Sequence, residues 1–416
     1  MKLNYKQTFF IGLAFLYISA FWQFYDSIIP LILQKTFHFK ETLTGVIMAM
    51  DNVLALFLLP LFGTLSDKTV SRYGKRMPYI VVGTLVSIVA LLLMVFANEQ
   101  KSVGLFIFSL GIALLGMGVF RSPAVALMPD FTPKPLRSKA NGVISLMGAI
   151  GGLFTLLAIH FLIPQQENPK YMPVFIAVAL LMLVCLAILM VTVRENKMTP
   201  VHDVEEETKT GGKLPKDVKK SLVFILAAVF FCYMSFNALT SAYSRYVERI
   251  WHIQGGAFAG SLLVFTLVAI VSFIPVGIAA EKIGRKKTIL CGLVILTLVY
   301  CLLFLLQNYS AAIYFIFALG GIGFAAFTVN MYPMVVDMSK SADVGRYTGY
   351  YYTFAMAAQI FTPILSGMFL EHISYKTLFP YAAFFSLLSL GAMIFVRHGD
   401  SKPKQKISLE SFAADD

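Results

Sequence analysis

The stretch Gly63–Pro78 reads GTLSDKTVSRYGKRMP and lies between two apolar runs. A shorter version of it, GIAAEKIGRKK, occupies Gly277–Lys287 in the second part of the chain. Both copies carry an acidic residue four positions after a glycine, and then a glycine followed by basic residues. Basic residues between membrane-crossing helices mark the cytoplasmic side of a bilayer. The pair therefore predicts a membrane protein built from two related halves, with one such loop on the cytoplasmic face of each.

The composition also indicates a membrane protein. Of the 416 residues, 58% are hydrophobic and 13% are charged, and the mean hydropathy is +0.76. A soluble domain carries about 25% charged residues. Apolar runs of about 20 residues recur along the chain, which is the length of a helix that crosses a bilayer. The predicted spans are 8–34, 41–63, 77–97, 103–129, 139–163, 172–193, 220–248, 257–280, 287–306, 310–336, 347–370 and 376–396. We expect an all-α membrane protein with twelve transmembrane helices.

The net charge of +12 reflects membrane topology and does not indicate nucleic acid binding. Alternate loops on one side of the predicted spans hold 26 of the 34 Lys and Arg residues, the other side holds seven, and Arg121 lies inside a span. Cytoplasmic loops carry this excess of basic residues, and such residues attract anionic lipid. Both termini are therefore predicted to be cytoplasmic, with the lipid bilayer as the partner of the basic loops.

The chain divides into two halves around one long polar linker. We expect an N-terminal six-helix bundle at 1–193, a cytoplasmic linker at 194–219, a C-terminal six-helix bundle at 220–397 and a cytoplasmic tail at 398–416. A further match joins Asp130…Arg137…Gly142 to Asp337…Arg346…Gly349, and it follows the loop motif in both halves. Parallel six-helix halves with a site near the midplane are the design of the major facilitator fold. A GxxxxGK[ST] nucleotide-binding loop is missing from the sequence, so neither ATP-driven pumping nor a cofactor is expected.

The first loop motif resembles a known transporter family. The pattern P-x-x-G-x-x-S-D-x-x-x-S-R-x-G-K-R-x-P, which begins at Pro60, is similar to the sucrose/proton symporters, relatives of the glycoside–pentoside–hexuronide cation symporters within the major facilitator superfamily. FRSPAVALMPD (Phe120–Asp130) and RSKANG (Arg137–Gly142) look like the bacterial branch of that group. The resemblance implies sugar transport coupled to a cation by a monomer in a bacterial cytoplasmic membrane. Melibiose-type relatives carry two acidic residues one turn apart on the second helix, and this chain has Asp51 alone, so we expect a proton and keep sodium as the alternative.

Two carboxylates inside predicted spans are candidates for proton coupling. Asp51 lies near the middle of the second span, where an ionised carboxylate is costly unless it is paired, hydrated or protonated. Asp26 lies in the outer third of the first span and shares a helix face with Trp22 and Gln23. An aromatic ring beside hydrogen-bonding groups suits a sugar. The alternatives are a structural hydrogen bond between helices for Asp51, with Asn52 as one candidate partner, and a hydrated Asp26 in an interfacial aromatic belt.

Other polar residues inside the spans are candidates for substrate binding. Arg121 needs a carboxylate, a substrate or backbone carbonyls around its guanidinium, or else its side chain extends to the cytoplasmic surface. The seventh span carries a polar stripe that includes Tyr233 and Asn237. For every one of these residues, a hydrogen bond between helices is an equally good explanation. The full set of substrate-binding candidates is Trp22, Gln23, Asn52, Arg121, Tyr233, Asn237, Asn330 and Gln359.

The charged loop residues predict a cytoplasmic gate. In related transporters this motif holds the cytoplasmic side closed while the outer side is open. Positive-inside topology alone would account for the basic residues, but not for the repeated acids at Asp67 and Glu281. The predicted gate residues are Asp67, Arg72, Arg76, Asp130, Arg137, Glu281, Arg285, Asp337 and Arg346.

Three other functions are alternatives to sugar uptake. An exporter of a drug or metabolite on the same fold stays open, because the chain has 19 Met and 37 Phe that could line an apolar site. A receptor or scaffold would carry a sizeable soluble domain, which the linker and the tail do not supply. An enzyme is not expected, because the six His residues are scattered at positions 38, 160, 202, 252, 372 and 398 and form no metal or catalytic motif.

Overall fold

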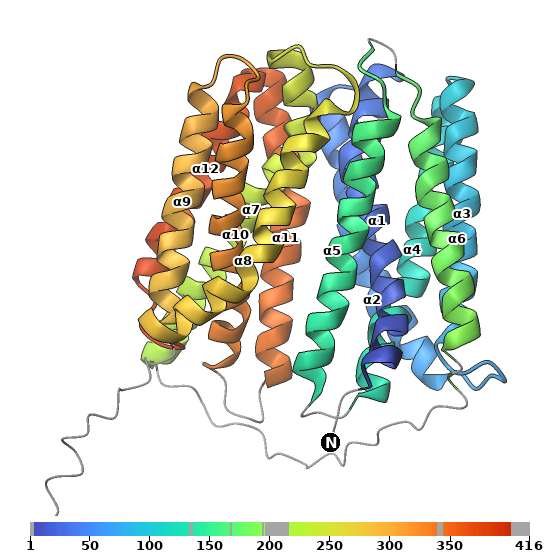
Figure 1. The fold of residues 1–416 in the computed structure, drawn as a ribbon, viewed down its shortest axis with the longest axis horizontal. Coiled ribbons are helices and arrows are strands. Elements are labelled where there is room, and N and C mark those ends of the chain that lie inside the picture. The colour runs from blue at the N-terminus through green and yellow to red at the C-terminus, as the bar shows by residue number, and fades with distance from the viewer. Residues whose placement is uncertain are drawn as a thin grey trace, which may run out of the picture.

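The computed structural model of the protein confirms the all-helical membrane architecture (Figure 1). It describes residues 4–132, 136–166, 169–193, 195, 216–338 and 344–400. Within these ranges, twelve helices are long and apolar enough to cross a membrane, and they coincide with the twelve predicted spans. The helices are α1 (Tyr5–Lys35), α2 (Glu41–Lys68), α3 (Met77–Glu99), α4 (Val103–Phe131), α5 (Arg137–Leu162), α6 (Met172–Thr192), α7 (Lys216–Ile250), α8 (Phe258–Ile283), α9 (Arg285–Leu305), α10 (Ala312–Val336), α11 (Val344–His372) and α12 (Leu378–Ile394), with short 3₁₀ turns η3 (Gly255–Ala257) and η5 (Tyr375–Thr377).

The twelve helices form two bundles that stand side by side, α1–α6 in one and α7–α12 in the other (Figure 1). Inside the bundles the most extensive packing joins α3 to α4, α1 to α5, α8 to α10 and α7 to α12. Across the bundles, α2 packs on α11 and α5 packs on α8. These two contacts are equivalent, because each joins the second helix of one half to the fifth helix of the other. The two halves therefore meet with the twofold relation that the repeated loop motif indicates.

The outer surface of the helices is apolar where a soluble protein would be polar. Phe57, Ile274 and Phe315 are between 70% and 77% exposed, and many other Leu, Val and Ile side chains are also exposed. A monomeric soluble protein rarely leaves apolar patches of this extent in water. Lipid tails cover such surfaces without cost, so the exposed side chains fit a helical bundle embedded in a bilayer.

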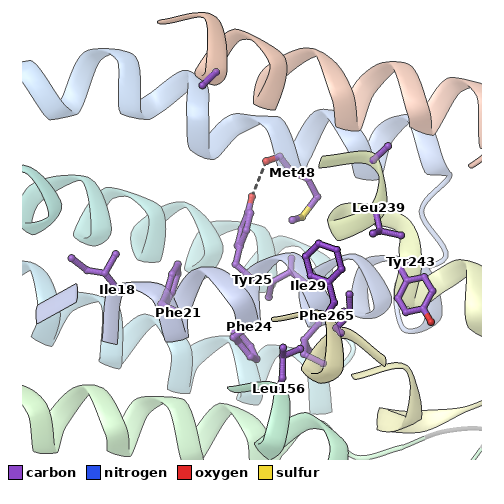
Figure 2. Close-up of a cluster of buried hydrophobic side chains, with 14 of the residues drawn as sticks. Ile18, Phe21, Phe24, Tyr25, Ile29, Met48, Leu156, Leu239, Tyr243 and Phe265 are labelled. Carbon is purple, nitrogen blue, oxygen red and sulfur yellow. Dashed lines mark hydrogen bonds between the residues drawn. The ribbon is translucent and has the colours of Figure 1, made fainter. Parts of the chain in front are cut away.

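Side chains from both halves meet around α1, in the middle of the molecule (Figure 2). The Tyr25 hydroxyl donates a hydrogen bond of 3.2 Å to the Met48 carbonyl and fixes α1 against α2. At the crossing of α2 and α11, Gly45 allows the backbones to touch, because a Cβ there would lie 2.1 Å from the Pro363 carbonyl oxygen. Small residues permit this close approach between membrane helices. The contact brings the polar side chains of α2 close to those of α11.

Candidate functional site

A polar cavity of about 240 Å³ lies where the two halves meet. Residues of α1, α2 and α4 form one wall, and residues of α7 and α11 form the other. Seven of the predicted site residues lie around this cavity, namely Trp22, Asp26, Asp51, Asn52, Arg121, Asn237 and Gln359. Their positions are separated by more than 300 residues of sequence, so only the packing of the two bundles brings them together. The structure therefore places both candidate carboxylates and the membrane-embedded arginine around one cavity.

The three charged groups of the cavity are close without forming ion pairs. Among the described residues, no salt bridge joins Arg121 to Asp26 or Asp51, although Arg121 and Asp51 attract each other electrostatically. The Arg121 guanidinium lies 5.4 Å from the centre of the Trp22 ring, and Asn52 Nδ2 donates a 2.8 Å hydrogen bond to Asp51 Oδ1. Arg121 thus lies inside the cavity, and its side chain does not extend to the cytoplasmic surface. The Arg121 guanidinium therefore contacts the Trp22 ring and lies in the field of Asp51, while Asp51 is hydrogen-bonded to Asn52.

Three hydrogen-bond donors of the cavity have no partner within the described protein. They are Trp22 Nε1, Asn237 Nδ2 and the Ser241 hydroxyl, all of them buried. A buried donor without an acceptor costs about 1–3 kcal/mol. All three donors belong to residues that line the polar cavity. Ser241 was not predicted, because its hydroxyl is one of many on α7 and the sequence does not show which of them face the cavity.

Three predicted binding residues lie elsewhere. Gln23 lines the neighbouring cavity described below and donates to the Ser27 hydroxyl at 3.0 Å, because one residue along a helix turns the side chain away from the face of Trp22. The Tyr233 and Tyr351 hydroxyls bond to each other at 3.1 Å. Asn330 donates to the Ala326 carbonyl of its own helix at 2.9 Å. Tyr233 therefore has a hydrogen bond between helices, whereas the Asn330 bond lies within α10.

A second cavity of about 500 Å³ adjoins the first, and Thr240 lines both. Its wall from the first half mixes apolar residues with the polar residues Ser19, Gln23, Asn141 and Ser145 of α1 and α5. The opposite wall carries Phe236 of α7, Phe265 and Phe273 of α8 and Phe324 of α10. The Phe236 and Phe324 rings stack with their centres 4.1 Å apart. The second cavity can thus receive an apolar group next to the polar cavity.

Charged residues at the cytoplasmic end of the first half form the predicted cluster. Arg76, whose side chain is 5% exposed, donates from Nε to Asp130 Oδ2 at 3.0 Å and also pairs with Asp67. Lys75 Nζ lies 3.1 Å from the same Asp130 oxygen. These bonds join the ends of α2 and α4 to the loop before α3. Arg72 lies over the ring of Tyr73, and the Arg137 side chain is outside the described residues.

The second half repeats this cluster in part. Arg285 pairs with Asp337 and joins the start of α9 to the end of α10. Glu281 is exposed, and no described ion pair includes it, so the match between Asp67 and Glu281 in the sequence does not extend to an equivalent contact. The Arg346 side chain lies outside the described residues. The described charged contacts at this end stay within one half, so none of them closes the cytoplasmic side between the halves.

Charged residues at the opposite end do cross between the halves. Arg245 of α7 donates from Nε to Glu41 Oε2 of α2 at 3.1 Å, and the two side chains are only 5% and 4% exposed. The Tyr375 hydroxyl donates to the same carboxylate, and Lys35 pairs with Glu248 across the same boundary. We call the set Glu41, Arg245 and Tyr375 the outer closure. In the topology given by the basic loops, it joins the two halves at their outer ends.

Comparisons with known proteins identify the family. The family described as "MFS/sugar transport protein" matches residues 10–361. An uncharacterized MFS-type transporter of Methanocaldococcus jannaschii is 25% identical over 360 residues, 85% of each chain. Multidrug resistance protein 2 of Bacillus subtilis is 25% identical over 94% of this chain and 95% of its own. An Arabidopsis thaliana sucrose transport protein is 25% identical over 29% of this chain and 23% of its own length.

Solved structures support the same fold. A bacterial homologue of the human lysosomal transporter Spinster, solved in an inward-facing conformation, superposes with a TM-score of 0.65 at 14% identity over 95% of both chains. The protein is therefore a multi-pass membrane protein with the fold of membrane transporters, as the sequence predicts. The chain belongs to the MFS/sugar transport protein family of the major facilitator superfamily.

Proposed function

We propose that this transporter takes up a sugar, either a disaccharide or a glycoside, together with a proton by alternating access. The observation that carries the proposal is the polar cavity between the halves, with Asp26, Asp51 and Arg121 around it. In this family fold the substrate site lies near the bilayer midplane, at the boundary between the repeats. The proposed location is the cytoplasmic membrane of a bacterium, and the proposed active unit is a monomer.

The groups around the cavity suit a polyhydroxyl ligand. The Trp22 ring offers a face on which the C–H groups of a sugar can stack, and its Nε1 donor is without a partner. Asn237 and Ser241 offer further unpaired donors, and Asp26, Asp51 and Gln359 offer acceptors. Sugar hydroxyls both donate and accept, so they can satisfy both kinds of group at once. We assign Gln23 and Asn330 no direct role in binding, because neither lines this cavity.

The charge balance of the cavity supports proton coupling. Two carboxylates face one guanidinium, so the ionised cavity carries one net negative charge. Adding one proton to Asp51 or Asp26 makes the three groups neutral, and a neutral cavity moves between the two sides of the membrane at a lower electrostatic cost. If the proton and the sugar favour the same closed state, the proton gradient drives sugar uptake. Sodium would have to replace the proton at the same carboxylates.

Alternating access requires that the outer and cytoplasmic closures form in turn. In this structure the outer closure is formed by buried contacts between the halves, and the charged clusters at the cytoplasmic end remain within each half. The gate residues Arg76, Asp67 and Asp130 are proposed to meet the opposite half when the cytoplasmic side closes. The outer closure must break at the same step, because both cannot hold when the bundles rock.

Purified protein in liposomes tests the proposal. We expect sucrose or another glycoside, added outside, to raise the external pH as protons enter with the sugar. Asp26→Asn and Asp51→Asn are made singly and together, with Glu99→Gln as a matched control, since Glu99 is an exposed carboxylate at the end of α3. Unchanged sugar-dependent proton uptake in the double variant would overturn the assignment of the carrier. A panel of sugars and glycosides without any uptake would overturn sugar transport.

A second candidate function is export of a drug or metabolite. The aromatic wall of the second cavity, formed by Phe236, Phe265, Phe273 and Phe324, favours it. The B. subtilis relative, named a multidrug resistance protein, aligns with nearly the whole chain. Under this alternative, protons entering the liposomes would drive aromatic cations out of them. Sugars would not compete with the aromatic cations for transport. The direction of transport in one preparation separates the two proposals.

A further inference from the structure

One buried carboxylate at the cytoplasmic end of the first half has no part in the transport mechanism above. Glu195 follows α6 in the sequence and is 6% exposed. Its Oε2 accepts backbone N–H bonds from Arg76 at 2.9 Å and Met77 at 3.1 Å, and its Oε1 accepts one from Lys75 at 3.0 Å. These amides are the unsatisfied donors at the start of α3, where the helix dipole favours a negative charge. Glu195 therefore caps a helix that begins 118 residues before it.

The backbone next to this cap is shaped to admit the carboxylate. Gly74 has φ +109°, a conformation that side chains other than glycine rarely adopt. A Cβ at position 74 would lie 2.2 Å from Glu195 Oε2 and would displace it. The α3 N-cap residue, Arg76, provides no side-chain cap of its own. The glycine of the loop motif is thus required by the carboxylate that it accommodates, as well as by the turn.

The second half repeats the arrangement. Asp400 follows α12, and its Oδ1 accepts the Lys286 backbone N–H at 3.0 Å, at the start of α9. Gly284 has φ +96°, and a Cβ there would lie 3.1 Å from Asp400 Oδ2. Lys286 Nζ donates to the carbonyls of Ile394 at 2.8 Å and Val396 at 2.6 Å, at the end of α12. An acid after the sixth helix of each half therefore caps the third helix of the same half.

Both caps hold the residues that carry the cytoplasmic gate. The amide of Arg76 binds Glu195, and the side chain of Arg76 binds Asp130 and Asp67. In the other half, Arg285 pairs with Asp337 directly beside the amide that binds Asp400.

We infer that Glu195 and Asp400 are matched positioning residues. Each joins the end of the sixth helix of its half to the gate loop, so that the gate arginine moves with the whole half. The inference holds for any substrate.

Distances between spin labels within each half test this inference. Labels at Val70 and Thr192 report the gate loop against the end of α6, and labels at Ile283 and Phe395 report the equivalent points of the second half; all four positions are exposed. The four native cysteines are first replaced by alanine, and each label pair is measured in the full-length protein in nanodiscs. We expect Glu195→Ala to broaden the Val70–Thr192 distance distribution and to leave the Ile283–Phe395 distribution narrow. Asp400→Ala should do the reverse, so each variant is the control for the other.

Two further variants distinguish positioning from a general loss of stability. Glu195→Gln keeps an acceptor without the charge and should partly restore the narrow distribution. Gly74→Ala should broaden the same pair, because it displaces the carboxylate and strains the turn. The inference is overturned if Glu195→Ala leaves the distribution unchanged, or if both halves broaden equally while the thermal midpoint falls.

Discussion

Replacing Arg245 with alanine removes the partner of a buried carboxylate in the outer closure. The Arg245 and Glu41 side chains are 5% and 4% exposed, and they meet at 3.1 Å across the boundary of α7 and α2. The Tyr375 hydroxyl also binds Glu41, so Glu41 would keep one neutral donor after the substitution. The bonds between Glu41 and residues of the opposite half exist only while the outer side is closed. The substitution should therefore destabilise this state and leave a state with an open, hydrated outer side largely unaffected.

The expected shift follows from the burial of the pair. Removing one partner of a buried ion pair costs about 3–5 kcal/mol, because the remaining charge is left in a poor solvent. At about 1.4 kcal/mol for each factor of ten, the ratio of outward-open to outward-closed molecules should rise by between roughly a hundredfold and a few thousandfold. Adding Glu41→Gln removes the stranded charge, so the double variant should show a smaller shift than Arg245→Ala alone.

Spin labels at Glu99 and Gln307 measure the outer opening. These exposed residues lie near the outer ends of α3 and α9, at opposite edges of the molecule (Figure 1). We expect Arg245→Ala to move the distribution toward longer distances, with Lys170→Ala, an exposed outer-side cation, as the matched control. An unchanged distribution would show that the pair does not hold the outer side closed. If Arg245→Ala combined with Glu41→Gln opens as far as Arg245→Ala alone, the cost does not come from the unpaired charge of Glu41.

Three other outcomes are expected. Asp51→Asn should still exchange substrate across the membrane when its concentration is equal on both sides. It should not accumulate substrate in response to a proton gradient, because the amide cannot carry the proton. Accumulation at the wild-type level would contradict this prediction. Trp22→Ala should raise KM roughly tenfold, because the lost ring face and the lost contact with Arg121 are together worth about 1–2 kcal/mol. Trp22→Phe should recover part of that loss. Equal KM values for the wild type and both variants would count against a substrate at this ring. Gly45→Val should force α2 away from Pro363 and stabilise the outward-open state, so the labels at Glu99 and Gln307 should move apart, whereas Gly104→Val, which has open space around it, should leave them unchanged.

Much of the candidate site was predictable because intramembrane polar residues are rare. Asp26, Asp51 and Arg121 are conspicuous in apolar helices. Burying such charged groups in a membrane is costly, so those that occur usually have a partner or a function. The sequence therefore identified them individually. It did not show that Trp22 lies on the cavity face while Gln23 turns to the neighbouring cavity, because this depends on the rotation of α1 against α2 and α7. Tyr233 and Asn330 have the same polar character as Asn237, and only their bonds to Tyr351 and Ala326 set them apart.

The cytoplasmic gate shows the same limit. The repeated motif predicts a gate of charged residues, and the structure groups Arg76 with Asp67 and Asp130 at one end of the first half. The match between Asp67 and Glu281 in the sequence does not extend to an equivalent described contact, because the pairing depends on which helix end faces the arginine. Glu195 and Glu41 were not predicted. Each lies at the end of a predicted span, where a charged residue is ordinary, and only the tertiary structure buries it against its partners.

The sequence by itself determined the class of this protein, its twelve spans, its two halves and its cytoplasmic face. These features follow from hydropathy, from loop charge and from an internal repeat, all of which are properties of the sequence near each residue. The tertiary structure decided which polar groups share a cavity, which acids are buried and which side of the molecule is closed. These depend on the packing of α2 against α11 and α5 against α8, which joins residues from opposite halves of the chain. The physical reason is that the burial and the hydrogen-bond partners of a helix face depend on which helix packs against it.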